Sequence, residues 1–548
     1  MAWWQERVGY QIYPKSFQDT NGDGIGDLQG IQNRIPYLKR LGVGFVWLSP
    51  IYLSPNIDNG YDISDYQAID PQYGDLKQFD QLVSAFHEAD IKVVMDLVLN
   101  HTSDQHDWFV QAASSRDNPY HDFYIWKDAK NGVPNNWQSI FGGSAWQYNQ
   151  ATDEYYLHIF ATEQPDLNWE NPQVRLAIYK MIEWWVLRGV DGFRLDAIIH
   201  LKKLQSFADV DDMDLAMRNV AGIDVFLKEL GQLFKQNDVM TVGEAMGAPI
   251  EDAAKWVSAD HGYFNMIFQF EHTQFFESGH LADLSVPKLK SVLTKWQNEL
   301  NDDGWNALFI ENHDLPRAVS TYGDDSEYWL ASAKCLAAWY FLMKGTPFIY
   351  QGQELGMINA DYPRIEDYQD IATHNQYDQL IKAGKSAADA LAIVQKISRD
   401  NARTPMQWND QENAGFTTGT PWLEVTPDYK LINAANQVDD DSSVFNFYRT
   451  LIHLRATTPA LISGRYDLLE TPGDQIYAYS RTLGDQQYII AANLSTESAN
   501  FDFAPELQPC VKQLVLGNYI FKTDFLTNDV SKLILQPFEV AVYKVSVN

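Results

Sequence analysis

The sequence has few cysteines, few basic residues and no long apolar run. Its 548 residues include two cysteines, Cys335 and Cys510, too few for a disulfide framework. No stretch of about 18 uninterrupted apolar residues occurs, so no membrane-spanning helix is predicted. Lysine and arginine number 41 against 73 aspartates and glutamates, a net charge of −32. Such a surface repels phosphate backbones and anionic lipids, which disfavours nucleic acid and membrane as partners and favours a neutral ligand.

The amino terminus and the aromatic content bear on the location of the protein and on its ligand. Residues 1–7 carry charges where a secretory signal needs an apolar core, so we expect a cytoplasmic protein. For the oligomeric state we expect either a monomer or a homodimer. The chain has 17 tryptophans and 29 tyrosines. Their apolar faces and polar tips suit the binding of sugar rings, although much of this aromatic content belongs in a core.

Eight β-rich runs recur along the first 350 residues, and helical periodicity fits the stretches between most of them, for example Asp75–Ala89 and Asn171–Arg188. The predicted strands are Val8–Tyr13, Gly44–Leu48, Lys92–Leu99, Gly192–Leu195, Met240–Val242, Phe264–Phe270, Ala307–Ile310 and Pro347–Tyr350. Strands that alternate with helices form parallel βαβ units, and eight such units favour a closed (β/α)8 TIM barrel over an open sheet.

Two regions depart from this rhythm. About 70 residues rich in Trp, Asn, Gly and Tyr follow the third strand, too many for a bare loop, and predict a small inserted domain. After about residue 465, strand-like alternation without helices predicts an antiparallel β-domain. We therefore expect the barrel over 1–100 and 172–464, the inserted domain over 101–171 and a C-terminal β-sandwich over 465–548.

Three predicted strands end in acidic residues: Asp196, Glu244 and Asp314. Barrel active sites form at these strand ends. Arg194 lies two residues before Asp196, so both side chains face the barrel mouth, where the arginine keeps the aspartate ionised. Two carboxyl groups at one site are what glycoside hydrolysis requires. The alternative is a buried structural network of ion pairs.

The chain resembles glycoside hydrolase family 13, the α-amylase family. The matching segments are Asp96–His101, Gly192–Asp196, Glu244 and Asn312–Asp314. Gln164–Asn168 is similar to the signature of the oligo-1,6-glucosidase branch, which also holds α-1,4-glucosidases, dextran glucosidases, sucrose isomerases and trehalose-6-phosphate hydrolases. The likeness runs from Tyr10 to Trp408, and more loosely through the terminal β-domain.

The resemblance implies a retaining double displacement. Asp196 would be the nucleophile, Glu244 the acid and then the base, and Asp314 the carboxylate that holds the sugar hydroxyls. The resemblance also implies the residues of a closed, exo-acting glucose pocket. These are Arg194 to orient the nucleophile, His101 and His313 as donors to sugar hydroxyls, Tyr61 to stack on the ring, Asp58 with Arg403 to close the non-reducing end, and Phe160 and Gln164 to line the wall. Arg399 is a second candidate for the closing arginine.

A loop near the amino terminus has oxygen-bearing residues at alternate positions and glycine at the sixth, like the start of an EF-hand. Its twelfth position is Gly30, not a glutamate, so the EF-hand is incomplete. The resemblance implies a structural calcium held by Asp19, Asn21, Asp23, the Ile25 carbonyl and Asp27. The alternative is a turn fixed by Asx hydrogen bonds. No organic cofactor is expected.

These observations predict a retaining α-glucosidase that acts on short α-glucosides, with sugar as a possible acceptor in place of water. Ala197 follows the nucleophile; α-1,6-specific members of the branch usually carry valine there, so the resemblance favours α-1,4 substrates such as maltose. The alternatives are an oligo-1,6-glucosidase, a sucrose isomerase or a trehalose-6-phosphate hydrolase. An inactive sugar-binding homologue would be marked by loss of an acid, and all three acids are present.

Overall fold

A computed structural model describes residues 1–273, 276–277, 280–281, 285–471, 473–503, 510–519, 526–527 and 532–546. Eight parallel strands pair in the order β11, β10, β9, β5, β2, β1, β15 and β14. Their bounds are Gly9–Ile12 (β1), Phe45–Leu48 (β2), Lys92–Val98 (β5), Gly192–Asp196 (β9), Met240–Glu244 (β10), Met266–Phe268 (β11), Ala307–Leu308 (β14) and Thr346–Tyr350 (β15). A parallel bridge between Ile267 and Asn306 joins the two ends of the sheet, which makes a nearly closed TIM barrel, as predicted.

Five barrel strands, β1, β2, β5, β11 and β14, are shorter than the sequence predicts, and β11 and β14 lose half of their length or more. β11 spans Met266–Phe268 within the predicted Phe264–Phe270, and β14 spans two residues of the predicted Ala307–Ile310. On β14, Leu308 already pairs with Pro347, and proline has no N–H to extend the ladder.

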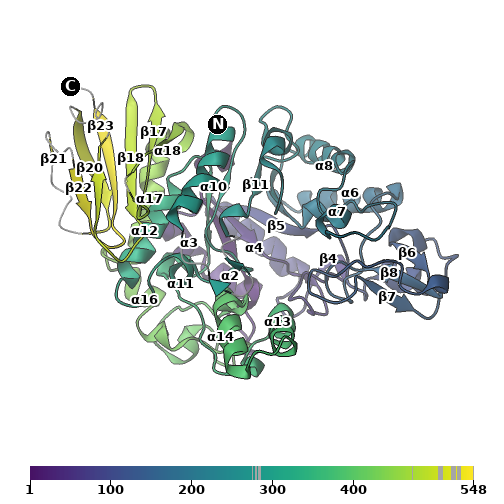
Figure 1. The fold of residues 1–548 in the computed structure, drawn as a ribbon. Coiled ribbons are helices and arrows are strands. Elements are labelled where there is room, and N and C mark those ends of the chain that lie inside the picture. Colours follow the sequence, from purple (N-terminus) through teal and green to yellow (C-terminus); the bar gives the residue numbers. More distant parts are fainter. Residues whose placement is uncertain are drawn as a thin grey trace.

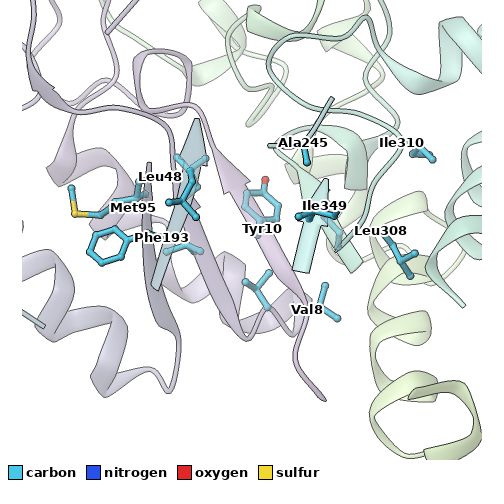
Figure 2. Close-up of a cluster of buried hydrophobic side chains, with 14 of the residues drawn as sticks. Val8, Tyr10, Leu48, Met95, Phe193, Ala245, Leu308, Ile310 and Ile349 are labelled. Atoms are coloured by element: carbon cyan, nitrogen blue, oxygen red, sulfur yellow. The ribbon is translucent and has the colours of Figure 1, made fainter. Parts of the chain in front are cut away.

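Alternate residues of each strand face different cores, as the pleat of a strand requires. Phe45 and Trp47 of β2 belong to the cluster inside the barrel, whereas Val46 and Leu48 belong to the larger cluster between strands and helices. Figure 2 shows part of that larger cluster, including Leu48. The helices that cover the barrel include α4 (Leu76–Glu88), α6 (Pro172–Val186), α8 (Asp224–Gln236), α10 (Val286–Glu299), α12 (Trp329–Phe341) and α17 (Val444–Ala456).

The helix ends follow local sequence signals. α4 begins after Asp75, whose carboxylate accepts the Gln78 N–H at 2.8 Å while the Gln78 side chain accepts the Asp75 N–H at 3.0 Å, a capping box. α6 begins after Asn171 with Pro172 in its first position, where the missing N–H of proline costs nothing.

Smaller sheets lie at the two ends of the molecule (Figure 1). Between β5 and α6, the strands β6 (Trp126–Asp128), β8 (Glu154–Leu157) and β7 (Trp146–Asn149) form an antiparallel sheet. At the other end, six antiparallel strands pair in the order β16 (Arg465–Leu469), β17 (Ile476–Leu483), β18 (Gln486–Asn493), β23 (Val540–Ser546), β20 (Val511–Gly517) and β21 (Leu526–Thr527). The pair β19 (Ala499–Asp502) and β22 (Lys532–Leu535) packs its Phe501 and Leu535 into the same core. Within the part of the chain that the structure describes, none of the helices has the length and hydropathy of a bilayer span.

Candidate active site

A pocket of about 700 Å³, its open mouth included, lies at the carboxyl ends of the barrel strands. It brings together side chains from segments far apart in the sequence. Eight of the predicted site residues line it: Asp58, Tyr61, His101, Phe160, Asp196, Glu244, Asp314 and Arg399. With Phe141 and His200, which also line it, the pocket is walled by four carboxyl groups and five aromatic or imidazole rings, a composition suited to a polyhydroxylated ring.

Arg194 of β9 lies beneath this pocket and is buried. Its guanidinium contacts three carboxylates: Asp96 at 3.0 Å, Asp196 at 2.6 Å and Glu244 at 2.8 Å. The Glu244 carboxylate also accepts the backbone N–H of Ala197 at 2.9 Å. One cation thus ties the ends of β9 and β10 together and fixes both candidate catalytic carboxyl groups at one mouth.

The carboxyl groups around Arg194 do not all ionise easily. Burial raises the pKa of Asp196 well above its ordinary value, and the negative charges of Glu244 and Asp96 raise it further against the opposing effect of Arg194. Burial likewise raises the pKa of Asp96 to about 6, although Arg194 counters it. Burial and like charge therefore favour the neutral forms of Asp196 and Asp96, and Arg194 opposes both effects.

The backbone is strained directly after Asp196. Ala197 adopts φ +46°, the left-handed region that residues with a side chain rarely occupy. This turn directs the Ala197 N–H at Glu244 and begins the short helix η4 (Ile198–His200) on the pocket wall. Such strain persists where the surrounding structure enforces it, and it is common at active sites.

Asp314 is surrounded by positive charge instead. Arg403 contacts its carboxylate at 2.9 Å and Arg399 at 3.3 Å. Burial alone raises the pKa of this carboxyl, but the adjacent guanidinium groups outweigh burial and hold the pKa well below its usual range. The pKa of Asp314 is thus shifted in the opposite direction to that of Asp196.

The wall opposite Asp196 comes from the loop before β4 (Asp65–Ile69). The Asp62 carboxylate accepts the N–H groups of Ile57 at 2.8 Å and Asp58 at 3.0 Å, which fixes the loop. Asp58 contacts Arg399 at 3.2 Å, and Tyr61 stacks on His313 with ring centres 5.3 Å apart. The loop thus contributes the acidic member of an ion pair and an aromatic ring to the pocket wall.

Four predicted residues support the wall without lining it: Gln164, Arg194, His313 and Arg403. Gln164 was expected to line the pocket, but it is fully buried and donates to Asp58 at 3.2 Å. His313 was expected to meet sugar hydroxyls, but its two ring nitrogens already contact Gln11 at 2.8 Å and Tyr61 at 2.6 Å. Both therefore hold neighbouring wall residues in place.

The preferred closing arginine also differs from the expectation. Arg399 lines the pocket, whereas Arg403 is buried and donates to the His313 carbonyl at 2.9 Å. Arg399 precedes the short helix α15 (Asp400–Arg403) and Arg403 ends it, so the two side chains lie about one helical turn apart along the chain. Asp370, the residue before α13 (Ile371–Lys382), contacts Arg399 at 2.5 Å. Sequence reasoning missed it, because it belongs to no predicted strand end and to no segment of the family resemblance.

The loop Asp19–Asp27 is held by Asx hydrogen bonds. The Asp19 carboxylate accepts the N–H groups of Asn21, Gly22 and Gly24, and the carboxylate of Asp27 accepts that of Gly30. Across the described ranges, no three acidic, histidine or cysteine side chains converge as metal ligands. The predicted calcium stays a prediction.

Comparison with known proteins gives consistent matches. Residues 11–464 match the sequence model of the family described as alpha amylase, catalytic domain. A Bacillus subtilis protein named probable oligo-1,6-glucosidase 3 is 48% identical over 99% of both chains. An alpha-glucosidase of Pediococcus pentosaceus is 47% identical over 87% of this chain and 89% of its own. The crystal structure of a Bacillus licheniformis trehalose-6-phosphate hydrolase variant superposes with a TM-score of 0.95 over the whole of both chains, at 42% identity.

Proposed function

Because the chain belongs to the α-amylase family, in its oligo-1,6-glucosidase and α-glucosidase branch, and is a glycoside hydrolase of the α-glucosidase type, we propose that it releases glucose from the non-reducing end of short α-glucosides with retention of configuration. The observation that carries the proposal is the shared contact of Asp196 and Glu244 with Arg194, at 2.6 Å and 2.8 Å. This shared contact supports Asp196 as the nucleophile and Glu244 as the proton donor of a double displacement.

The proposed reaction has two steps. Asp196 attacks the anomeric carbon, the glycosidic C–O bond breaks, and Glu244 donates its proton to the leaving oxygen. Glu244 then removes a proton from water, which attacks the same carbon and releases the Asp196 carboxylate. Asp314, kept ionised by Arg399 and Arg403, accepts hydrogen bonds from the hydroxyls of the sugar and offsets the positive charge that develops on its ring.

The proposed cleavage is confined to chain ends. Asp58 and Arg399 form a charged pair at 3.2 Å on the wall formed with Tyr61, and Asp370 holds Arg399 from behind at 2.5 Å. A wall of paired charges presents donors and acceptors to the terminal hydroxyls and leaves no passage for a longer chain. A polymer would therefore lose one glucose at a time.

For the linkage, we propose α-1,6 bonds as the first choice. The sequence alone favours α-1,4, but the relative that is 48% identical over the full length carries the name of an oligo-1,6-glucosidase. The α-1,4 linkage remains a second candidate because the small side chain of Ala197 lies on the pocket wall beside Asp196, where it leaves room for a closely held leaving sugar.

The ratio of kcat/KM on isomaltose to that on maltose tests this choice, with Ala197→Val as the matched variant. The proposal expects a ratio above one, whereas a strong maltose preference would support the second candidate. One or two methyl groups change such discrimination by about 10–200-fold. Valine at φ +46° is strained, but a ratio measured on the same enzyme is independent of the folded fraction. An unchanged ratio in the variant would show that linkage is set elsewhere. Trehalose-6-phosphate and sucrose, assayed beside them, test the other branch activities.

A further inference from the structure

The segments that follow Asp196 and Glu244 in the chain also contribute to the pocket wall. They provide Ile199, His200, Arg218 and Met246. Arg218 and Arg399 are the arginines on the described pocket wall, and Arg399 is committed to Asp58, Asp314 and Asp370. Arg218 is therefore the cation with hydrogen-bonding capacity to spare.

The contacts of Arg218 leave most of its guanidinium uncommitted. One terminal nitrogen contacts Asp214 at 2.8 Å, and the side chain is 26% exposed. Its Nε is buried and makes no hydrogen bond within the described chain. An unsatisfied buried donor has a desolvation cost that a ligand oxygen would remove.

The position of Arg218 is set by its neighbours in the chain. It caps α7 (Asp214–Met217), and the Met217 carbonyl accepts a hydrogen bond from His200 Nδ1 at 2.7 Å. The next residue, Asn219, donates to the Gly247 carbonyl at 3.2 Å. The segment therefore connects the helix after the nucleophile with the loop after Glu244.

Gly247 leaves space for the arginine stem. A Cβ built on this glycine, at φ +77°, would lie 3.0 Å from Arg218 Cδ. The close approach keeps the arginine stem against the loop that follows Glu244, the proposed proton donor to the leaving oxygen.

We propose that Arg218 determines specificity for the leaving sugar by donating hydrogen bonds to its hydroxyl or ring oxygens. The inference rests on the proposed function, and the same contact would hold a sugar that replaces water as acceptor. Asp214 balances the charge of Arg218, which favours a neutral sugar over a phosphate dianion. The net charge of −32 favours the same ligand.

The test compares Arg218→Ala and Arg218→Lys on the preferred disaccharide and on p-nitrophenyl α-glucoside, whose leaving group has no sugar hydroxyls. Removal of a hydrogen bond from a charged donor is expected to lower kcat/KM by about tenfold to a hundredfold. We expect that loss for Arg218→Ala on the disaccharide, a change within about twofold on the aryl glucoside, and partial recovery in Arg218→Lys.

The matched control is Arg465→Ala, since Arg465 also pairs with an aspartate, Asp467 at 3.0 Å, but lies on the C-terminal sheet. Equal losses on both substrates, or none, would overturn the proposal. If Arg218→Ala loses more kcat/KM on trehalose-6-phosphate than on trehalose, Arg218 binds a phosphate and the proposal of a neutral sugar is wrong. If the wild type does not cleave the aryl glucoside, the proposed function itself fails.

Discussion

The buried contacts of Lys203 test how the inserted domain is joined to the loop that follows Asp196. Its ammonium contacts Asp166 at 2.8 Å, the Asn100 side chain at 2.6 Å and the His200 carbonyl at 2.5 Å. The side chains of Lys203 and Asp166 are 1% and 0% exposed. Burial lowers the pKa of Lys203 and raises that of Asp166, so each charge depends on the other.

The structure sets the size of the effect. Two charges 2.8 Å apart attract by about 6 kcal/mol at an effective dielectric constant of about 20, before desolvation is subtracted. Removing one partner of a buried pair costs about 3–5 kcal/mol, because the other charge stays buried alone. With about 2.1 cal/mol/K of unfolding entropy for each of the 548 residues, this corresponds to a fall in Tm of about 3–4 °C.

The assay is a double-mutant cycle in Tm. Lys203→Met and Asp166→Asn are each expected to show the full loss, and the double variant is expected to recover more than half of the summed loss. Lys255→Met is the control, since Lys255 pairs with Asp252 at 2.7 Å but is 58% exposed, and it should change Tm by less than about 1 °C. Additive losses of Tm in the double variant, or a Lys203→Met variant as stable as the control, would show that the charges of Lys203 and Asp166 do not depend on each other.

Three further predictions concern pH, metal and the proton donor. Burial raises the pKa of Glu354 from about 4.5 to about 7, so its stabilising contribution is complete below about pH 4.5 and is lost as the pH rises through 7. Glu354→Gln should match the wild type in Tm at pH 5 and exceed it by about 3 °C at pH 8, because the rise in the Glu354 pKa to about 7 corresponds to about 3 kcal/mol. A Tm difference between variant and wild type that stays the same at both pH values would contradict this. If the Asp19–Asp27 loop binds calcium, a chelator should lower Tm and added calcium restore it, whereas an unchanged Tm with no metal by elemental analysis would leave the Asx turns alone. Glu244→Gln should lose far less kcat/KM on aryl glucosides with acidic phenols than on disaccharides, and equal losses would count against Glu244 as the acid.

The parts of the site that follow strand periodicity could be predicted from the sequence. The two-residue spacing of Arg194 and Asp196 on β9 places both side chains at the barrel mouth, and their contact at 2.6 Å agrees. The strand-end rule likewise brings Glu244 and Asp314 to the same pocket.

Residues from irregular segments could not be predicted in this way. Arg399 and Arg403 lie four residues apart, and only the tertiary packing of α15 decides which one reaches the pocket. Asp370 and Arg218 come from segments without strand periodicity, so nothing local indicates that they meet the barrel mouth. The short β14 depends on its partner Pro347, which belongs to a different strand.

The proposed double displacement requires Asp196 to form a covalent bond to glucose. The most direct measurement is trapping with 5-fluoro-α-glucosyl fluoride, which forms the glycosyl-enzyme quickly and releases it slowly, followed by peptide mass mapping. We expect one added fluoroglucosyl group on the peptide that contains Asp196, and none in Asp196→Asn. A label on Glu244 or Asp314, or a labelled Asp196→Asn variant, would contradict it.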